Sequence, residues 1–591
     1  MISEFGEGYV EALRKAWGKT VPGAADFVMF WWWSSAELLN KKGVRGFGLI
    51  TTNSIHQSTN RRCVEHFLSA TKANFKISYA IPDHPWVDSS NGAAVRISMT
   101  VATLSENDGA LAQVVSEKQL EDGEHAVTIS STYGVISSSL RIGPAVGKSS
   151  KLKSNEKLCW QGCKLVGSRF QISSAEAMAL ACPSSTYLKS YWTGGDLTQK
   201  RRERFVVDFF GLSRDEAEKA NQALFQHLLT NVYPERASNR DKGFREKWWL
   251  FGRSRPDLRK ACASLTKYIC TSEVSKHRIF TFLNWPQDLI DGSVMAVASD
   301  ETNLLGVLSS STHTLWSKIT GGRMGVGNDL RYQSGVCFET FPFPDLPEGE
   351  LKTRIRDLGE RLDAHRKARQ AAHPDLTLTG MYNVLEKLRK EEPLTEKDKT
   401  IHAQGLITLL KQIHDDLDAA VVEAYGARLA KAVSSNPQSD DSGLNEPNEG
   451  LETRAPHIPI ADRLARGDEA LEQAILQFLV DLNHEHAAEE ARGKIRYLRP
   501  KFQDPNYGKT VEKKEQDKLA LETDATPAPV IAEKLPWPKS TSDRVLTLKT
   551  LLQTLSPDPD LLSKALKGNN TPKRRNEIQD LLETLTLLGQ L

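Results

Sequence analysis

The chain has 591 residues, of which 39% are hydrophobic and 26% are charged, an ordinary composition for a globular protein. The length predicts about three to five domains. The formal net charge of +2 excludes a uniformly basic surface, so any site for nucleic acid has to come from local clustering of cations.

The seven cysteines show no spacing typical of a disulfide framework, which predicts a reducing, cytoplasmic location. Cys159 and Cys163 have no second ligand pair nearby, so we expect buried thiols and no metal site. The N-terminus has no apolar signal core. The most apolar run, residues 25–39, is too short and too polar for a membrane span, which predicts a deeply packed helix and no membrane partner.

The first hundred residues alternate between helical and strand patterns. We expect helices over 7–17, 24–40 and 59–71, and strands over 47–52, 75–81 and 93–104, with a loop over 82–92. This order is typical of the second half of a three-layer α/β sheet that ends in an antiparallel pair. The apolar run at 47–52 predicts a strand covered on both faces. Because no glycine-rich strand-to-helix turn precedes residue 40, we expect the sheet to begin upstream of Met1.

Later segments change in character. Residues 105–345 mix strand-like and helical pieces, and residues 349–430 are helical and highly charged. Two polar or proline-rich linkers precede a final helical unit in which Arg574 and Arg575 begin a helix. That unit fits either the recognition-helix half of a winged-helix module or a small helical bundle.

Several motifs resemble a known family. "DFVMFWWWSSAELLNKKGVRGFGLITTNSI" (26–55) and "PDHPWVDSSNGAAVRISM" (82–99) are similar to segments that follow the catalytic motif in gamma-class DNA adenine-N6 methyltransferases. "YWTGGDLT" (191–198) and "GGRMGVGNDLRYQSGVCFETFPFP" (321–344) resemble the MmeI-like group of restriction-modification and phage-defence methyltransferases. The resemblance covers most of residues 7–500, and the last motif is the most specific.

The resemblance implies an α/β fold, a partial Rossmann-like methyltransferase sheet, followed by an α+β target recognition domain and a helical C-terminal region. It implies S-adenosylmethionine as the cofactor of the complete enzyme and double-stranded DNA as the partner. The expected divisions are a partial methyltransferase domain (1–110), a target recognition domain (111–345), helical segments (346–436 and 461–505), linkers (437–460 and 506–540) and the terminal unit (541–591).

The family's catalytic Asn/Asp-Pro-Pro-Phe/Tyr motif and its glycine-rich cofactor turn are absent from the sequence. We therefore assign no catalytic residue. We expect a polypeptide encoded upstream to carry the missing motifs, unless the chain is a truncated or decayed product. The alternative is a non-catalytic DNA-binding specificity subunit.

Trp86 lies in the predicted loop between two prolines and a polar run. An enzyme that methylates a base has to rotate it out of the duplex, which costs a few kcal/mol, and stacking on an aromatic ring returns roughly 1–3 kcal/mol. By resemblance, Trp86 is the candidate platform for the extruded adenine. A Trp packed over a sheet edge is the alternative, and Tyr79 is the competing aromatic residue, although the pattern places it inside a strand.

Two further segments are candidates for DNA contact. Residues 236–278 carry 12 Lys/Arg against 4 Asp/Glu, and Lys276, His277 and Arg278 form a compact set of donors that could bind phosphate. The glycine-rich segment 321–332 follows a probable helix, so it is not a nucleotide-binding loop. Its side chains suited to base edges or phosphate are Arg323, Asn328 and Arg331. The alternatives are a solvated basic face and a structural turn.

Overall fold

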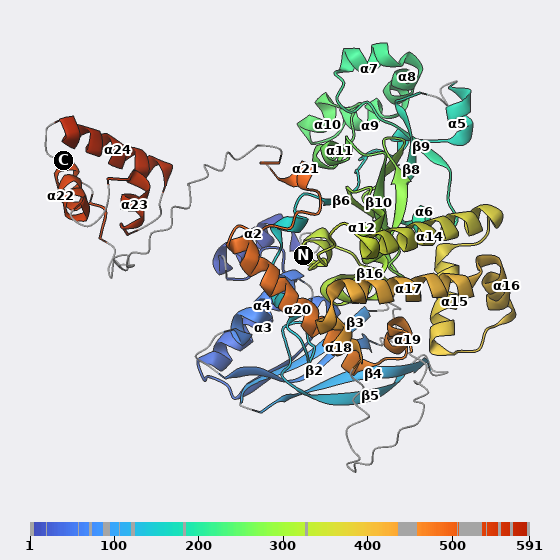
Figure 1. Cartoon of the computed structure of the whole chain (residues 1–591), viewed down its shortest axis with the longest axis horizontal. Coiled ribbons are helices and arrows are strands. Elements are labelled where there is room, and N and C mark those ends of the chain that lie inside the picture. The colour runs from blue at the N-terminus through green and yellow to red at the C-terminus, as the bar shows by residue number, and fades with distance from the viewer. Residues whose placement is uncertain are drawn as a thin grey trace, which may run out of the picture. The chain divides into compact units, whose positions relative to one another are not determined.

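The computed structural model divides into two compact units, Met1–Gly508 and Lys509–Leu591, which are described separately. The structure describes residues 5–18, 20–56, 58–69, 74–86, 95–105, 107–119, 125–180, 185–324, 329–434, 458–504, 506–507, 535–538, 540–552, 557–567 and 571–587. The larger unit contains an N-terminal sheet, a middle region of three small sheets and a set of helices (Figure 1). This mixed α/β architecture confirms the predicted fold class.

The N-terminal sheet has five strands in the order β1-β3-β2-β4-β5. Its elements are α2 (Glu7–Trp17), α3 (Val28–Asn40), β1 (Gly46–Thr52), η1 (Asn53–His56), α4 (Ser58–Leu68), β2 (Phe75–Trp86), β3 (Val95–Leu104), β4 (Gly109–Gln119) and β5 (His125–Gly134). Strands β2 and β4 are parallel, and the other neighbours are antiparallel. The strands predicted over 75–81 and 93–104 correspond to β2 and β3, which form the predicted antiparallel pair.

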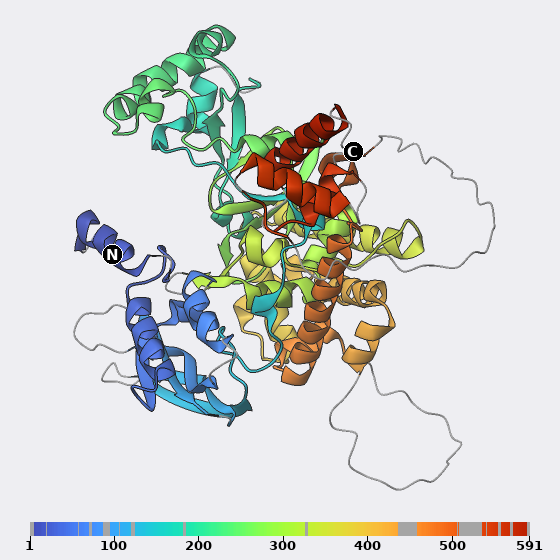
Figure 2. The ribbon, with the colours of Figure 1, turned by 90° about the vertical axis from the view of Figure 1, so that its left-hand side faces the viewer.

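Helices α3 and α4 lie on the same side of this sheet (Figures 1 and 2), and the core between them is aromatic. Trp32 of α3 is fully buried, and its ring contacts Phe47 and Phe75 of the sheet. Its indole N–H donates to Thr100 Oγ1 of β3 at 3.2 Å, which satisfies the one polar atom of a large buried side chain. The apolar run that predicted a packed helix therefore forms the cover of the sheet.

Three expectations for this region need correction. Strand β2 continues to Trp86, because residues 84–86 pair with β3 after a register shift, so residues 82–86 belong to a strand and not to the predicted loop over 82–92. Strand β1 pairs only with β3 in the described residues, and Ile50 is exposed, so β1 is an edge strand and is not covered on both faces. The sheet extends through β5, so the boundary drawn after residue 110 lies inside it.

The middle region contains three small sheets. Their orders are β12-β10-β14-β6, β13-β8-β9-β7 and β11-β16-β15. The strands are β6 (Cys159–Gln161), β7 (Gln171–Ser173), β8 (Leu188–Trp192), β9 (Arg204–Val207), β10 (Lys267–Ser272), β11 (Val274–Ser275), β12 (Thr281–Asn284), β13 (Asp288–Ile290), β14 (Val294–Val297), β15 (Gly322–Met324) and β16 (Asp329–Arg331). The helices are α5 (Ser174–Ala179), α6 (Gly194–Thr198), α7 (Arg214–Ala220), α8 (Gln222–Asn231), α9 (Tyr233–Ala237), α10 (Lys242–Glu246), α11 (Pro256–Cys262), α12 (Thr302–Ser309) and α13 (Ser311–Thr320).

Long helices follow the middle region and pack against it. They are α14 (Glu350–Ala372), α15 (Leu378–Lys390), α16 (Glu396–Gly405), α17 (Ile407–Tyr425), α18 (Ala427–Ser434), α19 (Ile460–Ala465), α20 (Glu469–Ala491) and the short α21 (Pro500–Gln503). The backbones of α12 and α14 approach closely at Gly359, where a Cβ would lie 2.7 Å from the carbonyl oxygen of Thr302. The close crossing joins the helical region to the middle region in one core.

The smaller unit contains α22 (Thr541–Leu552), α23 (Pro559–Lys564) and α24 (Pro572–Leu587) around a leucine-rich core. Its described residues include one isolated bridge, between Leu535 and Leu566, and no hairpin that could serve as a wing. This favours the helical-bundle interpretation. Among the described helices of the whole chain, none has both the length and the apolar character that a membrane span requires.

Candidate nucleic-acid interface

A polar cleft of 560 Å³ lies where the three small sheets meet. Gln161 comes from β6, Gln171 from β7 and Tyr191 from β8, while Arg331 comes from β16. The other lining residues are Cys163, Lys164, Leu165, Val166, Gly167, Glu273, Asp291, Gly292 and Ser293. The cleft therefore gathers donors and acceptors from segments up to 170 residues apart in the sequence.

A chain of hydrogen bonds crosses the cleft. Arg255 Nη2 donates to Gln161 Oε1 at 3.0 Å, and Gln161 Nε2 donates to Glu273 Oε2 at 3.0 Å. Arg331 approaches the other oxygen of Glu273 with Nε at 2.9 Å and Nη2 at 2.8 Å. Arg331 keeps 31% of its side-chain surface exposed and Glu273 keeps 14%, so both remain accessible from the cleft. Arginine, glutamine and glutamate are side-chain types that read base edges in DNA.

The glycine-rich segment follows α13 and contributes the strands β15 and β16. These strands pair antiparallel, with Arg323 opposite Leu330. Arg331 ends β16 and lines the cleft. Asn328 lies outside the described residues.

Lys276 and His277 lie together next to helix α15. Lys276 Nζ and His277 Nε2 each lie 2.8 Å from Asn383 Oδ1, and Lys276 is also 3.4 Å from a carboxylate oxygen of Glu386. Burial lowers the pKa of His277, so the imidazole is favoured in its neutral form. These contacts tie the segment after β11 to α15, while the Lys276 side chain remains half exposed.

Arg278 lies inside the fold, with 8% of its surface exposed. Its Nη2 donates to the Leu330 carbonyl at 2.9 Å, and its Nη1 donates to Thr271 Oγ1 at 3.2 Å and to the Ser272 carbonyl. Burial lowers the pKa of Arg278 to about 10, which leaves it charged at neutral pH. Because protein acceptors occupy both terminal nitrogens of this buried guanidinium, Arg278 is not available to a phosphate, contrary to the prediction.

Trp86 is 47% exposed at the end of β2, opposite Val95 of β3. Three residues earlier in the strand, Asp83 Oδ1 accepts hydrogen bonds from Arg96 Nε at 2.7 Å and Asn53 Nδ2 at 3.2 Å. These contacts fix the strand end from which the indole projects. Tyr79 lies within β2, between Val101 of β3 and Ala110 of β4, as expected for a strand residue.

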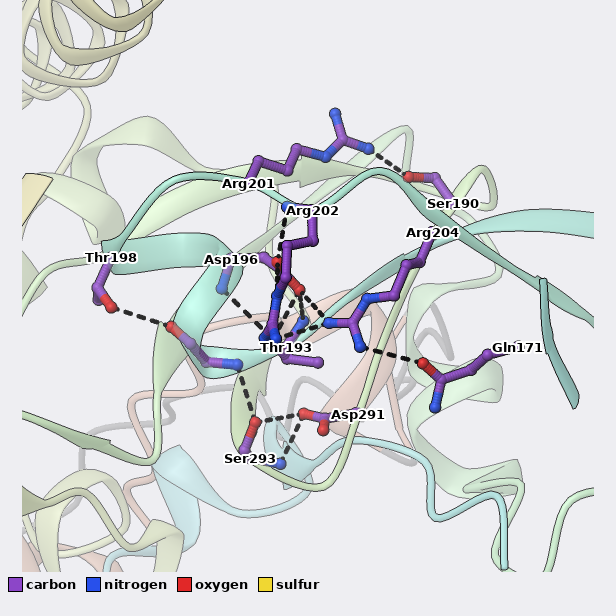
Figure 3. A network of polar contacts seen from close by, with 11 residues as sticks. Gln171, Ser190, Thr193, Asp196, Thr198, Arg201, Arg202, Arg204, Asp291 and Ser293 are labelled. Atoms are coloured by element: carbon purple, nitrogen blue, oxygen red, sulfur yellow. Dashed lines mark hydrogen bonds and ion pairs between the residues drawn. The ribbon is translucent and has the colours of Figure 1, made fainter. Parts of the chain in front are cut away.

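The sequence reasoning missed a second polar network beside the cleft, around the turn that begins α6 (Figure 3). Asp196 accepts hydrogen bonds from Thr193 Oγ1 at 2.6 Å and from Arg204 Nη2 at 2.9 Å. Burial opposes ionisation of Asp196, but the hydrogen bonds from Thr193, Arg202 and Arg204 outweigh it and lower its pKa. The signal in the sequence is the basic run "KRRER" at 200–204, directly after "TGGDLTQ".

The six cysteines among the described residues are all buried and unpaired. Burial raises the pKa of the Cys159 and Cys163 thiols, which suppresses the thiolate form. Among the described side chains, no three potential metal ligands lie together. The two cysteines of "CWQGC" are therefore part of the packing beside the cleft, with Cys163 lining it.

Comparisons with known proteins agree with this picture. Residues 146–345, which include every lining residue of the cleft, match the family model described as "MmeI, target recognition domain". A 58-residue stretch is 36% identical to DNA methyltransferase A of Bacillus subtilis (strain 168), covering 10% of this chain and 6% of that protein. The structure of the Type IIL restriction-modification enzyme MmeI in complex with DNA has a TM-score of 0.58 at 18% identity, covering 81% of this chain and 55% of that chain.

Residues 146–345 are therefore similar to a target recognition domain of this kind. The likeness to MmeI is a similarity of fold that covers 81% of this chain. The chain spans less than two thirds of the length of either protein that it matches.

Proposed function

We propose that this chain is the DNA-recognition portion of a site-specific, adenine-specific DNA methyltransferase, which transfers a methyl group from S-adenosylmethionine to adenine N6. The observation that carries the proposal is the polar cleft at the junction of the three sheets, which lies within residues 146–345. The relative MmeI was solved in complex with DNA, which supports duplex DNA as the partner of this chain.

The cleft is suited to reading bases because Arg331 and Glu273, two charged side chains that line it, are paired with each other and remain partly exposed. This ion pair can be exchanged for contacts with bases. An arginine binds O6 and N7 of guanine in two hydrogen bonds, and a glutamate accepts from the N4 amino group of cytosine. Each well-formed pair contributes about 1–3 kcal/mol of discrimination between bases.

Trp86 has the exposure required of a stacking platform. Its ring is half exposed at a strand end that the Asp83–Arg96 ion pair holds in place. We propose that the extruded adenine stacks on this ring, which would recover part of the cost of unstacking.

The described residues do not fit S-adenosylmethionine by themselves. Strand β1 enters η1, whose residues Asn53–His56 include no glycine, whereas a dinucleotide-type cofactor site uses a glycine-rich strand-to-helix turn. We therefore propose that the cofactor site and the catalytic motif are supplied by a polypeptide segment outside these 591 residues. Among the described residues β1 pairs only with β3, which supports this arrangement because an edge strand leaves backbone donors and acceptors free for a further strand.

The second candidate function is a non-catalytic DNA-binding specificity subunit. It is favoured by the absence of an Asn/Asp-Pro-Pro-Phe/Tyr motif from the sequence. The two candidates share the DNA-binding site and differ in whether a partner restores methyl transfer.

Both candidates require that the chain binds duplex DNA. Fluorescence anisotropy of labelled duplex DNA with the full-length chain, over a range of KCl concentrations, tests this requirement. We expect the logarithm of the association constant to fall linearly with the logarithm of the salt concentration, by about 0.9 for each phosphate contacted. Absence of binding at low salt would overturn the proposal. The purified chain alone should transfer no methyl group from labelled S-adenosylmethionine to DNA, and transfer by the single chain would contradict the assignment of the catalytic motif to a partner.

A further inference from the structure

A short basic run, Lys200–Arg204, lies beside the cleft. The run and the preceding helix α6 contact residues that line the cleft, since Arg204 Nη1 donates to Gln171 Oε1 at 3.2 Å and Gly194 N donates to Ser293 Oγ at 2.8 Å. Gln171 and Ser293 both line the cleft. Figure 3 shows Arg201 above Arg202 and Arg204 in this view, with Asp291 and Ser293 below them.

Arg201 is held in a fixed position and still has donors available. Its guanidinium carbon lies 3.9 Å from the centroid of the Trp192 ring, and Nη2 donates to Ser190 Oγ at 2.6 Å. Figure 3 shows its other terminal nitrogen pointing away from the network. Stacking on an exposed aromatic ring contributes about 0.5–1 kcal/mol, enough to restrict the side chain. Arg201 is therefore preorganised for a contact outside the protein.

The charges in this run are unequally neutralised. Arg204 contacts the buried Asp196 at 2.9 Å, and Lys200 contacts Asp375 at 2.7 Å. Arg202 lies 3.6 Å from the same Asp196 and keeps 67% of its side-chain surface exposed. In the described part of the chain, no carboxylate forms an ion pair with Arg201. Two exposed guanidinium groups therefore carry positive charge beside a cleft in which Arg331 is paired with Glu273.

We infer that Arg201 and Arg202 bind phosphates of the DNA backbone while the bases face the cleft. This inference rests on the proposed function, since it requires duplex DNA at the cleft. Phosphate is the chemistry that fits, because guanidinium groups bind its oxygens through paired hydrogen bonds and phosphates flank the groove on both sides. Such contacts set the position of the protein on the duplex and contribute no base specificity.

The test compares the full-length chain with the double variant R201A/R202A, using anisotropy of a labelled random-sequence duplex from 50 to 200 mM KCl. We expect the magnitude of the salt slope to fall by about 2 and the affinity at 100 mM KCl to fall by about 10- to 100-fold. The variant R201K/R202K keeps both charges and should retain most of the slope. Because all three proteins are compared by circular dichroism, a loss of folding is recognised independently of binding.

The matched control is R354A/R428A, which removes two exposed arginines that are ion-paired to glutamates on the helical region. It changes the net charge by the same amount and should leave the slope unchanged. If the wild-type chain binds DNA and R201A/R202A has the same slope as the wild type, the inference is wrong and the proposed function stands. If the wild-type chain does not bind DNA, the proposed function fails and the inference fails with it.

Discussion

Two arginines from motifs predicted to bind DNA have different surroundings in the structure. Arg331 lies at the cleft with a carboxylate partner, whereas Arg278 is buried among backbone carbonyls. The sequence could not separate them because both stand in short basic or glycine-rich motifs. The pairing of β11 with β16 decides the difference, since it brings Arg278 against Leu330, 52 residues away.

The first residue-scale prediction concerns Arg278→Met. The change leaves the carbonyl oxygens of Ser272 and Leu330 without their buried donor, so the free energy of unfolding should fall by about 2–4 kcal/mol. The salt slope of DNA binding should not change. Urea unfolding followed by circular dichroism measures the first quantity, with the half-exposed Lys276→Met as the control for the same motif. A stable R278M protein with a reduced salt slope would restore Arg278 as a phosphate contact.

The second residue-scale prediction concerns Trp86→Ala. Because the indole is half exposed, its loss should lower the free energy of unfolding by less than about 1 kcal/mol. The preference for a duplex with an unpaired adenine over a fully paired duplex should fall by about 5- to 150-fold, which corresponds to about 1–3 kcal/mol of stacking. Competition binding measures this ratio. Trp31→Ala, at an exposed tryptophan of α3, is the control. If W86A and the wild type prefer the duplex with an unpaired adenine equally, the result would argue against base stacking on Trp86.

At the scale of elements, helix α17 caps helix α13 through a buried carboxylate. Asp418 accepts from Ser311 N at 2.7 Å and from Ser311 Oγ at 2.6 Å. Burial opposes ionisation more strongly than these bonds and the nearby Arg389 favour it, and it raises the pKa of Asp418 to about 6. Asp418 therefore takes up a proton on folding at pH values between its pKa in the unfolded chain, about 4, and its pKa in the folded chain, about 6.

The variant Asp418→Asn cannot titrate at this position, so it tests whether Asp418 makes the stability depend on pH. Because the folded pKa lies above the unfolded one, the contribution of Asp418 to stability is present below pH 4 and is lost as the pH rises through 6. The free energy of unfolding of the wild type, relative to D418N, should therefore increase by up to about 3 kcal/mol as the pH falls from 7 to 4. Urea unfolding of both proteins at each pH gives the difference, and a difference independent of pH would contradict the assignment.

Local sequence patterns predicted most elements of the N-terminal sheet, because helices and strands there have clear periodicity. Helix 7–17 matches α2, and the predicted strand 47–52 matches β1 within one residue. The prediction that β1 is covered on both faces was wrong. An apolar run indicates a strand but does not indicate which elements pack against it. The cleft could not be predicted either, because its walls come from three sheets whose pairings join distant segments.

At the scale of the whole molecule, the two compact units have separate hydrophobic cores. Leu562 is fully buried in the core of the smaller unit. Leu562→Ala should destabilise that unit by about 2–5 kcal/mol. In differential scanning calorimetry of the full chain, only the transition of the smaller unit should move to lower temperature. A shift of every transition would show that the two units unfold together.

The central claim is that duplex DNA binds at the cleft and the basic run beside it, within residues 146–345. Hydrogen–deuterium exchange of the full-length chain with and without duplex DNA tests this most directly. We predict slower exchange on DNA binding in β8 and the run to Arg204, in the strands around Glu273 and Ser293, and in β16, with no change in α15–α18. Slower exchange confined to residues 541–591, or bound DNA with no change around the cleft, would contradict the account.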